Sequence, residues 1–270
     1  MKLRSIAGAL LLCLAGCASA GPSGAARLRV LTYNIHAGKD AAQQRNLDRV
    51  AEVIKASAAD IVLLQEVDRN TERSGREDHI AALAKLTGMD MWFAKSLDYQ
   101  GGDYGIAILS KLPLDTAYVV PLQVKPPQER SGTYEPRVGL HAVIRGPFGY
   151  LHVVNTHLDP AAEPTYRHQE IINLLANMAR TVSPGNPLIF GGDLNARPDT
   201  PEIAALTLSF LDTWRRCGDG GPGYSFPADK PDRRIDYIWL RDATCANARV
   251  LDTLASDHRP LLVEVLLPVR

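Results

Sequence analysis

The sequence has no excess of positive charge, and it lacks the nucleophile motif of a common hydrolase class. Its 30 Lys and Arg residues are matched by 30 Asp and Glu residues. Because a basic surface supplies most of a protein's non-specific affinity for DNA, this balance weighs against a duplex-DNA partner. No G-x-S-x-G segment is present, which argues against a serine hydrolase built on a nucleophile elbow.

Cysteine is scarce, and the spacings of structural zinc sites are missing. No Cys-x-x-Cys or His-x-x-x-His segment occurs among the four cysteines and seven histidines. Outside the N-terminal segment only Cys217 and Cys245 remain. The sequence leaves open whether these two form a disulfide or stay as free thiols, because it does not show whether their Cα atoms come within bonding range.

The N-terminal segment contains an apolar stretch that is too short to span a bilayer. Lys2 and Arg4 precede this stretch, which runs from Ile6 to Leu14. Cations followed by a short apolar core predict an export signal. Removing Lys2 and Arg4 with this leader leaves 28 basic residues against 30 acidic ones, so the mature chain is slightly acidic.

The end of this leader, Leu-Ala-Gly-Cys17, resembles the lipobox of bacterial lipoproteins. The resemblance implies a signal peptide over residues 1–16, a lipidated Cys17 as first mature residue, and a flexible tether over residues 17–26. Ala18 after the cysteine resembles the pattern for sorting to the outer membrane, so we expect an envelope protein anchored there and facing the periplasm. A plain secretory signal cut after Ala18 or Ala20 is the alternative.

The rest of the chain, residues 27–270, predicts one domain, because no internal repeat and no Pro- or Ser-rich linker divides it. Helical periodicity occurs at 46–57, 78–87 and 165–180. Strand-like runs are more numerous and lie at 28–35, 60–67, 105–111, 137–145, 150–158, 187–195, 233–240, 248–253 and 260–267. Many strands with fewer helices predict an α+β sandwich of two packed sheets covered by helices.

Polar residues recur toward the ends of these apolar strands. Regular alternation places Asn34 on the face of Val30 and Thr32, and it places Glu66 on the face of Val62 and Leu64. A carboxylate on an apolar face needs a cation, a metal or several donors, because an unpaired buried charge costs several kcal/mol. The alternative for Glu66 is a surface acid at a strand end.

Acidic and imidazole side chains follow the same pattern later in the chain. Asp236 alternates with apolar residues and needs a partner if its face is buried, either a histidine or a neighbouring arginine. Successive strand residues point to opposite faces, so Asp257 and His258 can serve one site only if residues 256–259 form a turn. His157 and His152 fall on opposite faces of one strand, which makes a zinc site using both improbable.

Taken together, these segments resemble the endonuclease/exonuclease/phosphatase superfamily, which includes deoxyribonuclease I-like enzymes and sphingomyelinases. The resemblance rests on Asn34, "QE" ending at Glu66, "YGIAILSK", "NTHL", "GDLN", "RIDYIW" and "SDHRP", in order and at similar spacing. It spans residues 27–270 and implies a four-layer αββα sandwich of two mostly antiparallel sheets. It also implies a magnesium-dependent attack of water on a phosphate ester at one rim of the sheets.

The resemblance assigns metal ligands and catalytic groups to numbered positions. Glu66 would be the main ligand of Mg²⁺, with Mn²⁺ or Ca²⁺ as alternatives, and Asn34 and Asp257 would complete the site. In the catalytic set, Asp193 would activate water, and Asn195 would orient Asp193. His157 and His258 would bind phosphate oxygens, and Asp236 would hold His258. Whether Asp193 or His258 acts as the base is left open.

Four further residues are candidates for substrate contact, namely Tyr104, Arg137, Arg167 and His36. For Arg137 a surface ion pair with Glu135 is an equally good interpretation. Many relatives carry Asn at the position of Ile106, so one polar substrate contact is in doubt.

We therefore predict a membrane-tethered phosphoesterase, most simply a phosphodiesterase, that acts outside the cytoplasm on a small or lipid-borne phosphate ester. An extracytoplasmic nuclease acting on DNA or RNA is the alternative with the same chemistry. A non-catalytic envelope lipoprotein that uses the fold for binding is the alternative of another class. No protein partner is evident from the sequence.

Overall fold

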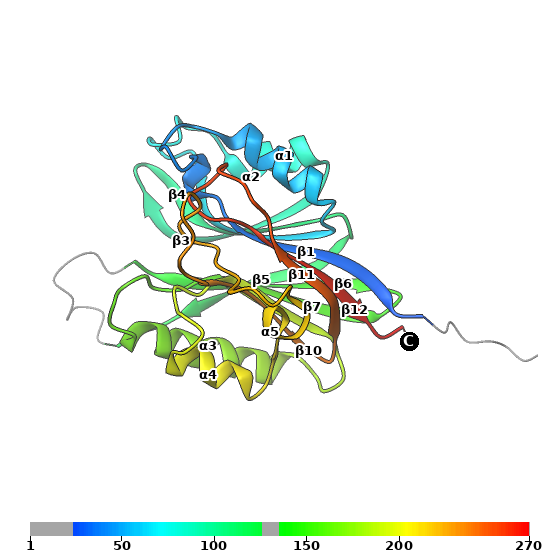
Figure 1. The fold of residues 1–270 in the computed structure, drawn as a ribbon. Helices are drawn as coiled ribbons and strands as arrows, with labels where there is room; N and C mark the ends of the chain where they lie inside the picture. Colours follow the sequence, from blue (N-terminus) through cyan, green and yellow to red (C-terminus); the bar gives the residue numbers. More distant parts are fainter. Residues whose placement is uncertain (1–23, 126–134, 270) are drawn as a thin grey trace, which may run out of the picture.

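A computed structural model describes residues 24–125 and 135–269, and these residues form two β-sheets packed face to face. Helices cover the outer face of each sheet (Figure 1). The predicted α+β sandwich is therefore confirmed, while the predicted leader, Cys17 and most of the tether lie outside the described residues. Among the described residues, no helix combines the length and the apolar character that a membrane crossing requires.

The first sheet combines the N-terminal strands with the last strands of the chain. Its spatial order is β11 (Thr244–Val250), β12 (Leu261–Leu267), β1 (Ala26–Asn34), β2 (Ile61–Arg69), β4 (Gly102–Ser110) and β3 (Asp90–Tyr99). Only β1 and β2 are parallel among these neighbours. Their parallel pairing requires a crossover, which the 3-10 turn η1 (His36–Gly38) and helix α1 (Leu47–Ser57) provide.

The second sheet repeats the pairing pattern of the first. Its spatial order is β5 (Leu114–Leu122), β6 (Arg137–Gly146), β7 (Gly149–His157), β8 (Leu188–Asp193), β10 (Asp236–Arg241) and β9 (Leu211–Asp212). Again the third and fourth strands, β7 and β8, are the parallel pair, and helix α3 (Thr165–Thr181) connects them. The two sheets therefore share one topology, although the sequence contains no visible repeat.

Apolar residues fill three layers between and outside the sheets. One core lies between the sheets and includes Leu63, Ile108 and Ile189. Helices α1 and α2 (His79–Thr87) cover a second core on the first sheet, and α3 and α4 (Pro201–Thr207) cover a third on the second sheet (Figure 1). The periodic segments near 46–57, 78–87 and 165–180 form the predicted helices because their apolar stripes face these cores.

Several elements were not predicted because their apolar signals are weak. Strands β3 and β5 lie at sheet edges, and most of their residues are exposed or half-buried. An edge strand needs no buried face, and β5 also contains Pro121, which demotes it in a pattern-based prediction. The short elements α4, β9 and α5 (Thr213–Cys217) were missed because they span too few residues for a period to emerge.

The pairing of the two late cysteines is resolved by the structure. Cys217 and Cys245 form a disulfide that joins α5 to β11. This bond links an element beside the second sheet to an edge strand of the first sheet, 28 residues later in the sequence.

Two buried histidines occupy the second sheet away from the strand ends. Nε2 of His141 lies 2.9 Å from Nδ1 of His152, and Nδ1 of His141 lies 2.7 Å from the hydroxyl of Tyr118. Burial lowers the pKa of His141 from 6.5 to about 4, and the proximity of His152 adds to this effect. The neutral form of His141 is therefore favoured in the folded protein.

We expect acid to destabilise the fold through His141. Below about pH 6.5 the unfolded chain takes up a proton at this residue, whereas the folded protein resists it down to about pH 4. The free energy of unfolding should therefore fall by about 3 kcal/mol across this range. Urea unfolding at several pH values should show a shallower decline for His141→Gln than for the control His168→Gln, whose side chain is exposed. Equal slopes in the two variants would contradict this assignment.

Candidate active site

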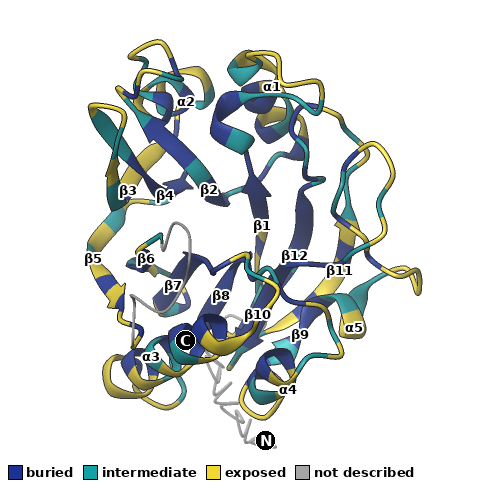
Figure 2. Cartoon of the chain, turned by 90° about the vertical axis from the view of Figure 1, so that its left-hand side faces the viewer, coloured by how far each residue is buried: buried dark blue, intermediate teal, exposed yellow. Residues whose placement is uncertain are grey.

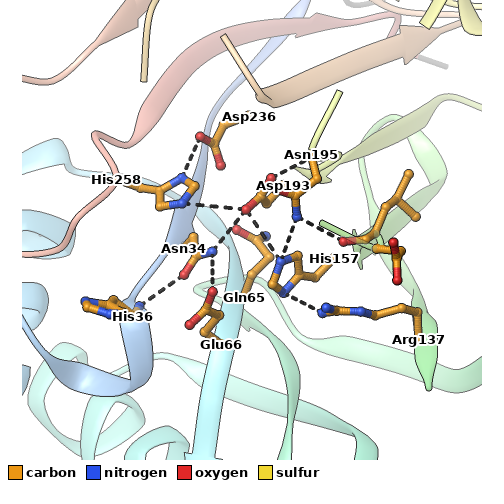
Figure 3. Close-up of polar contacts among 12 residues, drawn as sticks. Asn34, His36, Gln65, Glu66, Arg137, His157, Asp193, Asn195, Asp236 and His258 are labelled. Atoms are coloured by element: carbon orange, nitrogen blue, oxygen red, sulfur yellow. Dashed lines mark hydrogen bonds and ion pairs between the residues drawn. The ribbon is translucent and has the colours of Figure 1, made fainter. Parts of the chain in front are cut away.

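The carboxyl ends of the two parallel strand pairs meet at one rim of the sandwich. Asn34 ends β1 and Glu66 lies near the end of β2, while His157 ends β7 and Asp193 ends β8. The side-chain amide of Asn34 donates hydrogen bonds to Glu66 (3.0 Å) and to Asp193 (3.1 Å), so the two sheets contact each other directly at this rim (Figure 3). The repeated topology thus brings four predicted site residues together.

A buried polar bridge fixes the two sheets just behind this rim. The Gln65 amide donates to Asn155 Oδ1 at 2.7 Å, and the Asn155 amide donates to the carbonyls of Leu64 and Ala107 at 2.8 Å each. Gln65 belongs to β2 and Asn155 to β7, and both are fully buried. Hydrogen bonds in such a setting are directional and costly to break, so they hold the sheets in one register.

A cavity of about 320 Å³ opens at this rim. Figure 2 shows the strand ends and loops that surround this end of the molecule. Among the predicted site residues, the cavity is lined by Glu66, Tyr104, Arg137, His157, Asp193, Asn195, Asp257 and His258. Its other lining residues are Arg73, Tyr99, Glu135, Pro160, Phe226, Arg233 and Ile235.

Glu66 reaches the cavity through a break in its strand. The pairing of β2 with β4 shifts register between Leu64 and Val67, and Glu66 has a left-handed backbone with φ of 57°. Regular alternation would have turned its side chain toward α1 and α2 with Val62 and Leu64, which pack in that core. The predicted face was therefore wrong, because the bulge re-aims Glu66 toward Asn34.

Asn34 is a hydrogen-bond donor at the centre of the site. Its amide nitrogen faces the carboxylates of Glu66 and Asp193, and its Oδ1 accepts the backbone N–H of His36 at 3.0 Å. The amide nitrogen therefore orients the two carboxylates, while Oδ1 accepts one backbone hydrogen bond and keeps a second lone pair. The predicted ligand role of Asn34 stays a prediction.

Asp193 is the buried carboxylate on which the other groups converge. Its Oδ2 accepts the Asn34 amide, and its Oδ1 accepts the backbone N–H of Asn195 at 2.9 Å. Oδ2 also lies 3.5 Å from Nε2 of His157 and 3.6 Å from Nε2 of His258. Burial raises the pKa of Asp193 to about 7, and the carboxylate of Asp236 adds to this effect.

His258 lies on a turn and is held by a carboxylate behind it. The chain bends over residues 255–258, at the predicted turn, and this bend brings both Asp257 and His258 to the cavity. Nδ1 of His258 donates to Asp236 Oδ2 at 2.9 Å, and the same oxygen accepts the Ser225 hydroxyl. Burial would lower the pKa of His258, but the carboxylates of Asp236 and Asp193 outweigh it and raise the pKa to about 10. His258 is therefore a cation at neutral pH.

The alternative partners for Asp236 are engaged elsewhere. Arg234 pairs with the buried Asp212, and Arg233 pairs with Asp232. Arg233 also lies 4.8 Å from the ring centre of Phe226, which in turn packs against His258. Asp236 is thus committed to His258 and does not line the cavity itself.

His157, in contrast to His258, is held in its neutral form. Nη1 of Arg137 lies 3.1 Å from Nδ1 of His157, and the second Nη of Arg137 binds Glu135. A guanidinium can only donate, so Nδ1 accepts and the proton of the neutral ring sits on Nε2, the nitrogen nearer Asp193. Burial lowers the pKa of His157 well below its usual value, and the charges of Arg137 and His258 add to this effect.

Asn195 contacts Asp193 through its backbone N–H, not through its side chain. The side-chain amide donates to the carbonyl of Leu158 at 3.0 Å, and its nitrogen lies 3.1 Å from Nε2 of His157, where two donors face each other without a hydrogen bond. Asn195 has a left-handed backbone with φ of 49°, which turns the chain sharply after β8.

The four predicted substrate contacts divide into two groups. Tyr104 and Arg137 line the cavity. Arg167 does not, because its buried guanidinium binds Glu202 and the carbonyls of Asp159 and Ala161, where it supports the loop after β7. His36 lies behind the cavity, 3.7 Å from Asp257 and 3.3 Å from Gln43.

Sequence reasoning missed the residues that reach the site from loops and edges. Ser225, Phe226 and Arg233 come from the segment before β10, and Arg73 comes from the loop after β2. None of them continues a strand pattern. The buried acids Asp68 and Asp236 were the available signal, since each requires a partner that the strand itself does not supply. Ile106 is buried in the core between the sheets and contributes no polar contact.

The family model described as "Endonuclease/Exonuclease/phosphatase family" matches residues 31–258. The chain belongs to this family. The family includes metal-dependent phosphatases and nucleases, and its members are mostly hydrolases acting on phosphoester bonds.

Individual proteins that resemble this endonuclease/exonuclease/phosphatase family member have low sequence identity to it. The uncharacterized protein YbhP of Escherichia coli K12 is 26% identical over 253 residues, which span 88% of this chain and 95% of YbhP. A solved endonuclease/exonuclease/phosphatase of Beutenbergia cavernae is 26% identical with a TM-score of 0.73, covering 89% of this chain and 72% of that one. The mannosyl-6-phosphatase of Bacteroides thetaiotaomicron, 16% identical with a TM-score of 0.73 over 88% and 99% of the chains, shares the fold.

Family members generally use a divalent metal ion, and the cavity offers donors for one. Asp193, Asp236 and His258 place ligand atoms within 4.8 Å of one another. Asp236 and His258 already satisfy each other, however, whereas Glu66 and Asp257 present carboxylates directly to the cavity. Oxygen donors suit a hard divalent ion that keeps several waters, so the residues present fit such an ion.

Proposed function

We propose that the protein is a magnesium-dependent phosphoesterase that hydrolyses a small phosphate ester by attack of water. The observation that carries this proposal is the placement of the buried Asp193 between a neutral and a cationic histidine, beside the carboxylates of Glu66 and Asp257. These groups share one cavity and supply both halves of the reaction, acceptance of a proton and stabilisation of negative charge.

Asp193 would accept the proton of the attacking water. A base works best when its pKa lies near the working pH, and the pKa of Asp193, raised to about 7, meets this condition. The hydrogen bonds from Asn34 and from the Asn195 backbone hold the carboxylate in one orientation. A fixed acceptor of this kind aligns the water for in-line attack on phosphorus.

The two histidines would bind the non-bridging phosphate oxygens. His258 offers Nε2–H as a cation, and His157 offers Nε2–H as a neutral ring. Both nitrogens lie within 3.6 Å of Asp193 Oδ2, so their donors converge on the point where the water would react. Donors fixed before the reaction stabilise the charge that develops on the phosphoryl group.

Glu66 and Asp257 would hold the divalent ion, with Asn34 orienting Glu66. Bound there, the ion would supply a Lewis acid that neutralises charge on the phosphate and its leaving oxygen. Small substrates are favoured over duplex nucleic acid because the cavity is compact and the chain carries no excess of basic residues.

A substrate panel tests this function. We expect the purified protein with Mg²⁺ to hydrolyse sugar phosphates or small phosphodiesters faster than single- or double-stranded DNA, RNA or phospholipid vesicles. Chelation should abolish turnover, and added Mg²⁺ should restore it. Preferential cleavage of DNA or RNA would establish the nuclease instead, and no turnover of any substrate with Mg²⁺, Mn²⁺ or Ca²⁺ would leave a binding protein.

We also propose that Cys17 is lipidated and anchors the protein in the cell envelope, outside the cytoplasm. The order of cations, apolar core and small residues before Cys17 supports this location. A disulfide between Cys217 and Cys245 is in keeping with an oxidising compartment.

Radioactive palmitate should label the wild-type protein in bacterial cells and should not label Cys17→Ala. The Cys13→Ala variant is the matched control, because that cysteine lies in the same leader before the predicted cleavage point. Equal labelling, or its absence, in all three proteins would return the leader to an ordinary secretory signal.

A further inference from the structure

The cavity extends beyond the predicted catalytic residues to a wall formed by Arg73, Tyr99 and Tyr104. Arg73 lies in the loop after β2, Tyr99 ends β3, and Tyr104 lies near the start of β4. None of these residues contacts Asp193 or either catalytic histidine through a hydrogen bond or ion pair within the described part of the chain. The wall therefore has no part in the proposed chemistry.

Arg73 is fixed in position by a buried acid and two aromatic rings. Its Nε and one Nη donate to the two carboxylate oxygens of Asp68 at 2.7 and 2.8 Å, and Asp68 is completely buried. Its guanidinium carbon lies 4.5 Å from the ring centre of Tyr99 and 5.3 Å from that of Tyr104. A guanidinium held on three sides loses little conformational entropy when it binds a ligand.

One edge of this guanidinium remains available. The other nitrogen, Nη1, has no hydrogen-bond partner among the residues that the structure describes, and 27% of the side chain is exposed. Arg137 differs, because both of its Nη atoms are engaged, by His157 and by Glu135. In the cavity lining, Arg137 is thus engaged by neighbouring side chains, whereas Arg73 has donors left over for a ligand.

We propose that Arg73 forms a second anion-binding subsite, so that the preferred substrate is a compact phosphate ester bearing a second phosphate group. This inference rests on the proposed function for the identity of the first phosphate site. A planar guanidinium edge is the side-chain group best matched to phosphate oxygens. A cavity of about 320 Å³ has room for a molecule of roughly sugar-phosphate size that reaches both Glu66 and Arg73.

The ion pair between Arg73 and Asp68 determines how this subsite distinguishes substrates with a second phosphate from those without one. Because the carboxylate balances the charge of Arg73, attraction at long range is weak, and selection depends on short, directional hydrogen bonds. The preference for a second phosphate should therefore persist at high salt concentration.

The test compares glucose 6-phosphate with glucose 1,6-bisphosphate. We expect kcat/KM for the bisphosphate to exceed that for the monophosphate by about tenfold or more, since a charge-assisted hydrogen bond contributes on that order. Arg73→Lys should remove most of this preference, because lysine keeps the charge beside Asp68 but lacks the planar set of N–H donors of a guanidinium. The monophosphate rate should change by less than about twofold. Arg73→Gln should act in the same direction. Arg145→Gln is the matched control, since Arg145 stacks on Tyr150 at 5.4 Å outside the cavity.

A second measurement separates this subsite from the proposed function. Calorimetric titration of the metal-free protein with the same two sugar phosphates should show tighter binding of the bisphosphate, and Arg73→Lys should abolish the difference. If neither compound is hydrolysed but this difference is seen, the subsite stands and the phosphoesterase proposal fails. If both compounds are hydrolysed and neither substitution alters the ratio or the binding difference, the subsite is refuted. Thermal melts of Arg73→Lys establish that the variant is folded.

The second phosphate could belong to a soluble compound or to a lipid headgroup, which share this chemistry. Vesicles of phosphatidylcholine with and without phosphatidylinositol 4-phosphate form a separate arm of the assay. Arg73-dependent turnover confined to these vesicles assigns the subsite to a headgroup, whereas turnover of the free bisphosphate assigns it to a soluble substrate. Arg73-independent turnover in both arms overturns the proposal.

Discussion

Asp193→Asn should lower kcat by about 10³-fold without reducing the stability of the protein. The amide has nearly the shape of the carboxylate, but its single oxygen can accept only one of the hydrogen bonds from Asn34 and the Asn195 backbone, and it cannot take a proton from water. Because burial raises the pKa of Asp193, the ionised side chain is unfavourable in the folded state. Relief of the buried charge offsets the loss of one hydrogen bond, so we expect a melting temperature close to that of the wild type.

The matched control is Asp199→Asn, which makes the same chemical change at an exposed position six residues later. Initial rates on the best substrate of the panel, together with thermal melts, measure both effects. If Asp193→Asn retained more than about a tenth of the wild-type rate, Asp193 could not be the proton acceptor.

Asp236→Asn should lower kcat by about 10² to 10³-fold at pH 8, and part of this loss should be recovered at pH 6. Asp236 is a positioning residue, since it acts on the substrate only through His258. In the wild type its carboxylate, together with that of Asp193, outweighs the effect of burial and raises the pKa of His258 to about 10. Without that charge the pKa falls, so His258 loses its second proton as the pH rises through neutrality.

The pH dependence of kcat distinguishes this role from a purely structural one. The wild-type rate should not lose the contribution of His258 until the pH approaches 10, whereas the variant should decline at a much lower pH. Asp115→Asn, at an exposed position on β5, is the control. Parallel profiles for wild type and Asp236→Asn would show that Asp236 does not act through the charge of His258.

Much of the site could be predicted from the sequence because strand ends carry it. Apolar runs with a clear two-residue period are interrupted or ended by Asn34, His157, Asp193 and Asp236. Pairs of parallel strands bring such ends to one edge of the sheet. The pairing of Asp257 with His258 required a turn, and the turn is present. Local geometry left structural alternatives open for these residues, and their assignment to one site came from the resemblance to the superfamily.

The parts that could not be predicted depend on contacts between distant segments. The orientation of Glu66 is set by a bulge, which a regular two-residue period cannot reveal. The side-chain oxygen of Asn34 accepts a hydrogen bond from the backbone N–H two residues later, which the spacing of residues in the sequence does not indicate. Arg167 and Arg137 look alike in sequence as lone arginines near motifs, yet only the packing around Glu202 and His157 separates a structural role from a site role.

The shared topology of the two sheets implies a division of labour within the molecule. Under the proposed function, the first β-α-β unit would supply Glu66 for the cation, with Asn34 orienting it, and the second would supply Asp193 for the proton and His157 for the phosphate. Mutations in one unit could therefore alter ion preference while proton transfer is conserved, and the reverse holds for the other. The two properties can evolve separately for as long as the hydrogen bond from Asn34 to Asp193 keeps the units aligned.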